Sequence, residues 1–303
     1  MEYARKRIKA ELRSKYPYVD DVVVLTHAYG CGVAINAPQA VAPIRTLQNL
    51  AKNPTIGGDL LVIGLGCEMN QIAPLAQTLA PRPDGLIATL TIQEEGGTRE
   101  TIDRGAALVR AMLPIANDVR REPVPASHLT VGLQCGGSDG YSGITANPAL
   151  GAAVDLLAAH GGTAILSETP EIYGAEHLLT RRANPEVGAR LIERIRWWED
   201  DTRRIDGNMN NNPSPGNKAG GLTTILEKSL GAAAKGGTTR LKAVYEYAEA
   251  VTAKGFGVMD TPGYDPVSAT GQVAGGSNIL CFTTGRGSAY GCKPTPSIKI
   301  ATN

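Results

Sequence analysis

Several common sequence signals are absent from this chain. It has no run of about 18 consecutive apolar residues, which a membrane-spanning helix would require. Aromatic residues make up only 5% of the chain, which argues against an aromatic-rich binding surface. The formal net charge is only +1, so there is no excess of positive charge for binding a polyanion. We therefore expect neither a membrane nor a nucleic acid among its partners.

The sequence also lacks a Cys-x-x-Cys pair, although it contains five cysteines. This absence disfavours a zinc ribbon and a dithiol redox protein. Residues 1–16 are charged and lack the apolar core of a signal peptide. We expect a cytoplasmic chain whose cysteines are reduced.

Glycine is abundant, with 36 residues, and 42% of the chain is hydrophobic, which together predict a folded protein with many tight loops. Helix-like segments, such as residues 98–113 and 148–160, separate short apolar runs without polar alternation. Such runs are typical of strands buried on both faces of a parallel sheet. The runs that predict strands are residues 21–26, 59–64, 85–92, 129–133, 163–167, 255–260 and 278–283.

The order of these segments predicts an α/β fold with a Rossmann-like, mostly parallel sheet and helices on both faces, in two subdomains. We expect a first α/β domain at residues 1–125, which would serve dimerisation in a homodimer. A second α/β domain at residues 126–303 would carry most of the site and be truncated at its C-terminus. Within it, residues 186–201 predict a long amphipathic helix, and residues 206–221 form a polar stretch rich in Asn, Pro and Gly.

The loops that follow the predicted strands carry the candidate site, because ligands bind beyond the carboxyl ends of parallel strands. Cys31, Cys67 and Cys135 each stand beside a glycine in such a loop. Two interpretations stay open for these cysteines. They are either small buried residues or thiolates that converge on iron or an iron–sulfur cluster.

Carboxylates and a histidine occupy other predicted strand ends. Glu168 and Glu171 flank a proline after one run and would suit a divalent cation or a general base. The alternative is that they decorate the start of a helix, where acidic side chains favour the dipole. His27 follows the first run and would be a base, a ligand or a hydrogen-bonded loop residue.

Two segments are candidate anion sites. Residues 212–221 place Asn217 and Lys218 just before a helix predicted to start near Leu222, where backbone N–H groups bind anions. The ordinary alternative there is a capped loop. Residues 283–287 contain Thr284 and Arg286, and an arginine can fork a carboxylate. Two such sites around one cleft favour a polyhydroxylated acid as ligand, with a carboxylate at each end.

At these same segments the sequence resembles the altronate/galactarate dehydratase family. The resemblance covers nearly the whole chain. Residues 29–35 are more similar to the galactarate branch, whereas residues 168–176 and 212–221 are more similar to the altronate branch. The segments that carry the likeness are residues 26–32, 64–68, 134–139, 142–148, 212–218, 283–287 and 290–291.

The resemblance implies that a sugar acid loses water to give a 2-keto-3-deoxy acid, with the help of a divalent metal. Fe²⁺ is expected, with Mn²⁺ or an iron–sulfur cluster as alternatives. Our expected roles then fall into three groups of residues. The proton-transfer candidates are His27, Lys218 and Glu168. The substrate-binding candidates are Ser138, Asn217, Lys218, Thr284 and Arg286. The metal-binding candidates are Asp139, Glu168, Cys135, Cys67 and Cys31.

The sequence departs from the family pattern at both ends. Family members usually carry a small N-terminal β-domain (SAF-like), and they continue beyond the point equivalent to Asn303. We expect either a fragment or one subunit of a split enzyme, with the SAF-like domain as a separate or missing partner. The alternatives are the large subunit of a sulfolactate sulfo-lyase-like enzyme and a non-catalytic subunit that binds sugar acids.

Overall fold

The structure is a computed structural model that describes residues 2–27, 29–56, 59–79 and 85–303. The chain divides into two compact units, Met1–Pro123 and Val124–Asn303. Each unit is considered by itself below. No helix in these described ranges is both long enough and apolar enough to cross a membrane.

The first unit contains a two-stranded parallel sheet and a small helical core. Helices α1 and α4 pack together through Ile8 and Leu12 on one and Ala106 and Leu113 on the other. Along the chain, its elements are α1 (Glu2–Lys15), η1 (Pro38–Ala40), α2 (Val41–Ala51), β1 (Leu60–Gly64), α3 (Ile72–Thr78), β2 (Ile87–Thr91) and α4 (Thr98–Asn117).

The strand predicted at residues 21–26 is wrong, because this segment has no strand pairing in the structure. Val22 instead packs against the small core between α1 and α4. Asp21 beside it pairs with Arg5 of α1. The run is therefore apolar because it covers a helix pair, and His27 and Cys31 follow an irregular segment rather than a strand.

The second unit is built on a six-stranded sheet whose order is β5-β6-β4-β3-β7-β8, with every neighbouring pair parallel. The predicted α/β class and parallel sheet are thus confirmed. Its strands are β3 (Thr130–Cys135), β4 (Thr163–Leu166), β5 (Leu241–Tyr245), β6 (Gly255–Met259), β7 (Ile279–Thr284) and β8 (Ser297–Ala301). Its α-helices are α5 (Ala146–Ala159), α6 (His177–Thr180), α7 (Pro185–Arg204), α8 (Pro215–Ala219), α9 (Ile225–Ala234) and α10 (Asp265–Ala274). Its 3-10 helices are η2 (Ala126–His128), η3 (Thr169–Ile172) and η4 (Met209–Asn211).

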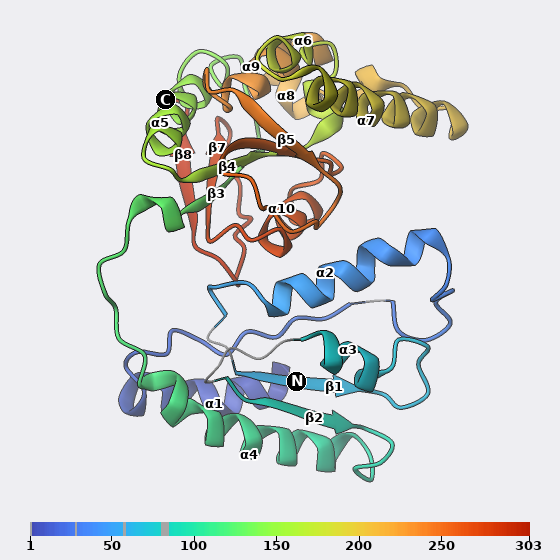
Figure 1. The fold of residues 1–303 in the computed structure, drawn as a ribbon, viewed down its shortest axis with the longest axis vertical. Helices are drawn as coiled ribbons and strands as arrows, with labels where there is room; N and C mark the ends of the chain where they lie inside the picture. The colour runs from blue at the N-terminus through green and yellow to red at the C-terminus, as the bar shows by residue number, and fades with distance from the viewer. Residues whose placement is uncertain (1, 28, 57–58, 80–84) are drawn as a thin grey trace. The chain divides into compact units, whose positions relative to one another are not determined.

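Helices cover both faces of this sheet, as the sequence predicts (Figure 1). Successive side chains of a strand point to opposite faces. Leu133 of β3 therefore packs in the main core with residues of α5 and α9. Its neighbour Gln134 points to the other face, where its amide bonds to Ser268 and Gln272 of α10.

Strand β5 is absent from the sequence prediction, and its place at the edge of the sheet explains why. Among the described strands it pairs with β6, and its other side carries only an isolated bridge between Leu241 and Ala183. Lys242 in its middle is exposed and interrupts the apolar run that marks a buried strand. Charged residues on edge strands discourage pairing with other chains, so this lysine suits the position.

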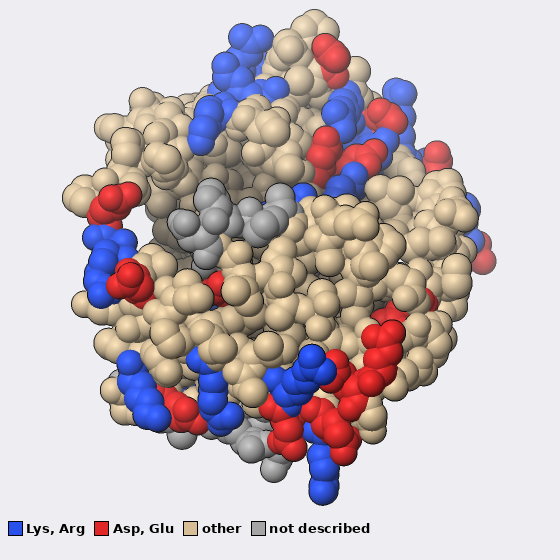
Figure 2. Space-filling view, turned by 60° about the horizontal axis from the view of Figure 1, so that its bottom comes forward, with Lys and Arg blue, Asp and Glu red and all other residues tan. Residues whose placement is uncertain are grey.

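The surface mixes charges of both signs. On the face shown in Figure 2, Lys and Arg side chains lie among Asp and Glu side chains. Along α7, Arg203 pairs with Asp200 and Glu199, and Arg204 pairs with Asp201. Exposed pairs of this kind add little stability, so the fold depends mainly on the buried core.

The close approach of α5 to the end of α9 requires a glycine. A Cβ on Gly151 would lie only 2.2 Å from the carbonyl oxygen of Ala234. We expect Gly151→Ala to destabilise the unit by about 2 kcal/mol or more, because backbone atoms must move to make room.

The measurement is denaturant unfolding of wild type and variant. Gly216→Ala on α8 is the matched control, since a Cβ there meets its nearest atom, Ser214 Oγ, at 3.8 Å. The control should change stability by less than about 0.5 kcal/mol. Equal effects of the two substitutions would contradict the steric argument.

Candidate functional site

The second unit has a topological switch point between β3 and β7. The chain passes from β3 through α5 to β4 on one side. It later returns from β6 through α10 to β7 on the opposite side of β3. Crevices for ligands form at the carboxyl ends of strands where the direction reverses in this way. The loops after β3 and β7 therefore form the expected ligand-binding edge of the sheet.

These two loops interlock tightly. The N–H groups of Gly285 and Arg286 both donate to the carbonyl oxygen of Gly137, at 3.2 and 2.8 Å. Gly137 has φ +59°, a left-handed conformation that glycine adopts without strain. A Cβ on Gly285 would lie 2.1 Å from Cγ of Asp139, so only glycine fits there. The glycine-rich sequence after each strand thus permits the contact between loops.

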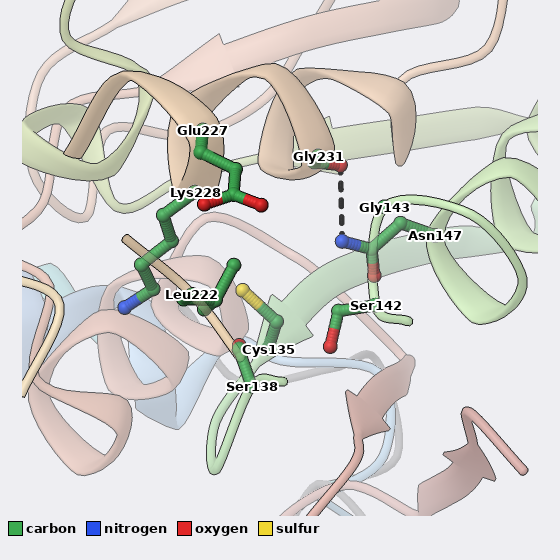
Figure 3. Close-up of a pocket in the computed structure, with 9 residues that line it drawn as sticks. All are labelled: Cys135, Ser138, Ser142, Gly143, Asn147, Leu222, Glu227, Lys228 and Gly231. Atoms are coloured by element: carbon green, nitrogen blue, oxygen red, sulfur yellow. Dashed lines mark hydrogen bonds between the residues drawn. The ribbon is translucent and has the colours of Figure 1, made fainter. Parts of the chain in front are cut away.

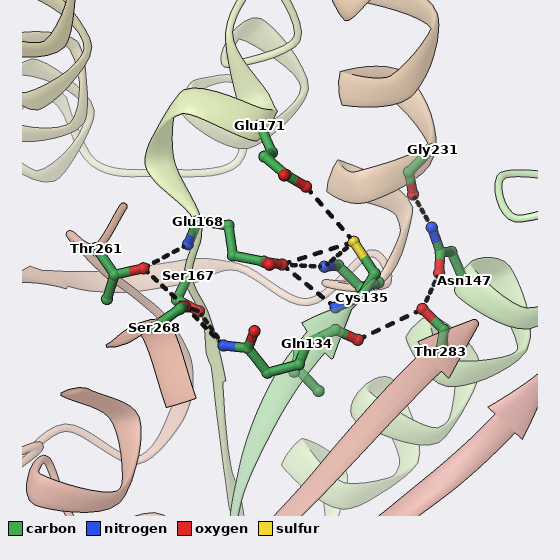
Figure 4. A network of polar contacts seen from close by, with 12 residues as sticks. Gln134, Cys135, Asn147, Ser167, Glu168, Glu171, Gly231, Thr261, Ser268 and Thr283 are labelled. Carbon is green, nitrogen blue, oxygen red and sulfur yellow. Dashed lines mark hydrogen bonds and ion pairs between the residues drawn. The ribbon is translucent and has the colours of Figure 1, made fainter. Parts of the chain in front are cut away.

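A buried triad of Cys135, Glu168 and Glu171 lies beside this loop pair (Figure 4). Cys135 is the last residue of β3, Glu168 follows β4, and Glu171 belongs to η3. The Cys135 sulfur lies 3.6 Å from Glu168 Oε2 and 3.7 Å from Glu171 Oε2. One candidate ligand atom from each residue lies within 4.8 Å of the others, close enough for all three to hold one metal ion.

The backbone of Glu168 is held in an unusual conformation. Its φ of 67° lies in the left-handed region, which costs a non-glycine residue of the order of 1 kcal/mol. Its N–H donates to Thr261 Oγ1 at 2.9 Å, and the next N–H, of Thr169, donates to the Thr261 carbonyl at 3.0 Å. The end of β6 therefore fixes the turn that directs the Glu168 side chain toward Cys135.

Two lysines of the α9 region face the carboxylates. Lys228 and Lys235 are seven residues apart, about two helical turns, so they project from the same face of the helix. Lys228 Nζ donates to Glu171 Oε1 at 2.8 Å and to Asn212 Oδ1 at 2.9 Å. Lys235 Nζ donates to Glu168 Oε2 at 2.9 Å and to the Cys135 sulfur at 3.0 Å. The lysines thus balance the charge of the two carboxylates.

Burial shifts the acid–base properties of this cluster. It raises the pKa of Glu168 to about 7, although Lys235 opposes the shift. Burial, with the nearby Glu168 charge, raises the pKa of the Cys135 thiol to about 12. For both lysines, burial alone lowers the pKa, but the facing acidic groups outweigh it and the net shift is upward. The lysines are therefore fixed positive charges, and Glu168 titrates near neutral pH.

A small pocket opens beside Cys135 (Figure 3). Ser138 and Ser142 line it from the loop after β3, and Lys228 lines it from α9. The loop after β3 and helix α9 approach each other closely beside this pocket, since a Cβ on Gly143 would lie 3.0 Å from the Gly231 Cα. The pocket has a volume of about 10 Å³, so it has room for about one water molecule beside the Cys135 sulfur.

The triad fits a metal ion chemically. Glu168 Oε1 is buried and has no hydrogen-bond partner among the described residues. Leaving such an atom without a partner is unfavourable, and a cation would satisfy it. One sulfur and two carboxylate donors suit a transition metal better than Mg²⁺ or Ca²⁺, which prefer oxygen alone.

Most of the substrate-binding residues predicted from the sequence lie together at the switch point. Asn217 donates to the Ser138 carbonyl at 2.9 Å, which ties α8 to the loop after β3. Thr284 accepts a hydrogen bond from the Gly287 N–H at 3.0 Å in the loop after β7. A Cβ on Gly220 would contact both Asp139 and the Arg286 side chain, at 3.1 and 3.2 Å. The proximity is a finding, whereas their substrate roles stay predictions.

Asp139 lies outside the triad, and its carboxylate already has several partners. Oδ1 accepts from the Tyr141 N–H and the Ser142 hydroxyl, and Oδ2 accepts from the Thr302 hydroxyl. These bonds close the loop after β3 and attach it to the residue after β8. The metal role predicted for Asp139 stays a prediction, and we do not include it in the metal site proposed below.

The helix predicted to start near Leu222 begins instead at Ile225, and Lys218 lies exposed in α8. Ser214 caps α8 by accepting from the Asn217 N–H, and Thr224 accepts from the Glu227 N–H at the start of α9. Protein groups thus already satisfy N–H groups at both helix starts. An anion contact at this segment depends on the Lys218 side chain, and that role stays a prediction.

His27, Cys31 and Cys67 lie in the first unit, and all three are exposed. The Met69 N–H donates to the Gly30 carbonyl at 3.1 Å, which brings their two loops together. Gln93 donates to the Cys67 sulfur at 3.4 Å. The catalytic role of His27 and the metal roles of the two cysteines stay predictions.

Lys228 and Lys235 are not among the site residues predicted from the sequence. Lysines on a helix usually read as solvent-facing residues, yet these two are only 8% and 0% exposed. A signal was present, because Ile225, Lys228, Ala232 and Lys235 follow the three-four spacing of a buried helix face. Lysines at such core positions indicate buried acidic partners.

Comparison with known proteins gives a family match for each unit of the chain. The C-terminal domain of D-galactarate/altronate dehydratases matches residues 126–303. The chain belongs to the D-galactarate/altronate dehydratase family. The second domain of D-galactarate dehydratase/altronate hydrolase matches residues 1–117. The family resemblance seen in the sequence motifs is therefore confirmed.

The chain is similar to named proteins of several bacteria. The chain is 44% identical to galactarate dehydratase (L-threo-forming) of Escherichia coli K12, over 100% of this chain and 59% of that protein. It is 39% identical to altronate dehydratase of Bacillus subtilis 168, over 94% of this chain and 56% of the relative. It is 34% identical to (2R)-sulfolactate sulfo-lyase subunit beta of Chromohalobacter salexigens, over 80% of this chain and 66% of that protein. The chain thus spans just over half the length of the two dehydratases.

The burial of Cys135 leads to a prediction about thiol reactivity. The thiolate is the reactive species, and the pKa of the Cys135 thiol is raised to about 12 in a side chain that is 3% exposed. Iodoacetamide at pH 8 should therefore label the exposed Cys31 and Cys67 at least about a hundredfold faster than Cys135.

Peptide mass spectrometry over a time course measures the rates. The control is the same reaction in denaturant, where these cysteines should react at similar rates. Labelling of Cys135 in the folded protein as fast as Cys31 would contradict the buried site.

Proposed function

We propose that this chain forms the catalytic core of a metal-dependent hydro-lyase that converts a sugar acid into a 2-keto-3-deoxy acid. The observation that carries the proposal is the buried Cys135–Glu168–Glu171 triad, balanced by two buried lysines, in a chain 44% identical to a galactarate dehydratase. The substrates we propose are aldaric and aldonic acids of the galactarate and altronate type.

The reaction removes one molecule of water from neighbouring carbons. A base takes the proton from the carbon next to the carboxylate, and the hydroxyl on the following carbon leaves with a proton as water. The resulting enol then tautomerises to the 2-keto acid. Negative charge develops on the substrate during proton removal, so fixed positive charges near the carboxylate lower the barrier.

In this proposal Cys135, Glu168 and Glu171 hold the metal. A bound divalent metal would act as a Lewis acid on a substrate oxygen. Fe²⁺ is the metal we propose, with Mn²⁺ as the alternative, because the mixed sulfur and oxygen donors suit a transition metal. An iron–sulfur cluster has less support, since a single cysteine stands with two carboxylates in the triad.

The chain's own residues bind the substrate and move protons. Lys228 and Lys235 supply fixed positive charge beside the pocket. Lys218 or His27 removes the proton, and Glu168, whose pKa is about 7, is a third candidate only where it is not a metal ligand. Arg286 grips a substrate carboxylate, while Ser138, Asn217 and Thr284 line the switch point and bind substrate oxygens.

The setting we propose for this activity is a homodimer in the cytoplasm that works with a SAF-like β-domain. A second candidate is the large subunit of a sulfolactate sulfo-lyase-like enzyme. It is favoured by the 34% identity to a sulfo-lyase subunit that is itself one part of an enzyme. Release of sulfite rather than water distinguishes the two.

A substrate panel tests the proposal. Purified protein loaded anaerobically with Fe²⁺ or Mn²⁺ is assayed for keto-acid and sulfite release from aldarates, aldonates and sulfolactate, with and without an added SAF-like domain. We expect keto-acid formation from galactarate or altronate. Glu168→Gln and Glu171→Gln should each lower kcat/KM by at least about a hundredfold, because each removes a ligand.

Glu186→Gln is the matched control, since Glu186 is an exposed glutamate at the start of α7. It should keep wild-type activity and metal content. No bound metal and no turnover, even with the SAF-like domain present, would reject the enzyme proposal and leave a binding subunit as the alternative.

Metal binding at the triad should strengthen as pH rises. A metal must displace the proton of the Cys135 thiol, whose pKa is about 12, and below about pH 7 also that of Glu168. Affinity should rise about tenfold per pH unit above pH 7 and more steeply below it. Chelator competition between pH 6 and 8 measures the slope. Cys135→Ser should lower this slope by one proton released for each metal ion bound. A metal affinity that does not change with pH would contradict the proposed ligand set.

A further inference from the structure

Lys235 is the most deeply buried charged side chain of the site. It is the C-cap residue of α9, and none of its surface is exposed. Burying an ammonium group costs several kcal/mol unless it is paired and hydrogen-bonded. Its Nζ offsets the cost of burial by donating to the Cys135 sulfur at 3.0 Å and to Glu168 Oε2 at 2.9 Å.

The backbone that carries Lys235 is fixed by close packing. Gly151 of α5 lies against the Ala234 carbonyl, where a Cβ would lie at 2.2 Å. A Cβ on the following Gly236 would lie 2.4 Å from the Phe256 ring. Because there is no room for a methyl group at Gly151 or at Gly236, the backbone position of Lys235 is fixed. Its ammonium is placed by the fold rather than by a flexible chain.

The two partners of Lys235 are two of the three donors of the triad. On Glu168 the ammonium occupies Oε2, which also accepts the Cys135 N–H at 3.3 Å. The other oxygen, Oε1, is buried and unpaired within the described residues. Lys235 therefore holds the carboxylate in one orientation and leaves one defined oxygen available.

We propose that Lys235 is a positioning residue for the metal site, one that holds Glu168 Oε2, leaves Oε1 available as a ligand and would weaken electron donation from the Cys135 sulfur to a bound metal. This inference rests on the proposed function, in which Cys135 and Glu168 are ligands. A hydrogen bond from a cation draws electron density from a thiolate, and partners of metal ligands tune the metal in this way. A divalent metal held beside Lys235 would remain electron-poor, which would suit the polarisation of a substrate oxygen.

Lys228 offers an internal comparison. It is also buried and also paired with a carboxylate of the triad, Glu171, at 2.8 Å. Its second hydrogen bond goes to the amide oxygen of Asn212 rather than to sulfur, at 2.9 Å. Replacing Lys228 removes the same charge from the same helix without removing a hydrogen bond to the thiolate.

Cobalt substitution gives a readout that is independent of activity. Co²⁺ bound to a thiolate shows a sulfur-to-metal charge-transfer band in the near ultraviolet, and its energy reports how strongly the sulfur donates. We expect this band in the Co²⁺-loaded wild-type chain and not in Cys135→Ser. Lys235→Met should move the band to longer wavelength, because the sulfur loses its charged donor. Lys235→Gln should give a smaller shift, and Lys228→Met should leave the band nearly in place.

The outcomes separate this inference from the proposed function. Absence of the band in the wild type, or its persistence in Cys135→Ser, would reject Cys135 as a ligand and this inference with it. A band that is present but unmoved in Lys235→Met and Lys235→Gln would reject only the role of Lys235. Circular dichroism checks folding of each variant. Failure of both Lys235 variants to fold would assign the lysine to core stability and overturn the proposal.

Discussion

The pairing of two buried carboxylates with two buried lysines is the constraint on which the second unit depends. Glu168 and Glu171 face Lys235 and Lys228, and the Cys135 sulfur lies within 4 Å of both carboxylates and of Lys235 Nζ. Each charge alone would be too costly to bury, so each element that carries one must be placed by its partner. Strand β3, the turn before η3 and helix α9 therefore act as one assembly.

Close contacts through glycine allow these elements to meet. α9 approaches α5 and the loop after β3 at Gly151, Gly143 and Gly231, where side chains would keep the backbones apart. The interlocked loops after β3 and β7 depend in the same way on Gly285. The high glycine content thus serves the positions where a parallel sheet, its helices and the site converge.

Membership of the D-galactarate/altronate dehydratase family and the geometry of the site support the same proposal by different routes. The family gives the class of reaction that its named members carry out. The structure adds a set of donor atoms and fixed charges that suits such a reaction. Family membership did not single out the two lysines; their burial does, and the three-four spacing of α9 is the sequence signal that agrees with it.

The sequence by itself determined the α/β class, six of the seven predicted strands to within about two residues of their ends, and the family. Apolar runs and glycine-rich loops are local features of the chain, so they can be recognised in the sequence without knowledge of the fold. The strand prediction failed at two segments. Residues 21–26 are apolar because they cover helices, and β5 carries a lysine because it lies at an edge of the sheet. Only the tertiary structure decided that Cys135 stands with Glu168 and Glu171, while Asp139 closes a loop. Those partners lie 33 residues or more from Cys135, and Lys235 lies 100 residues away, so only folding around the buried charges brings them together.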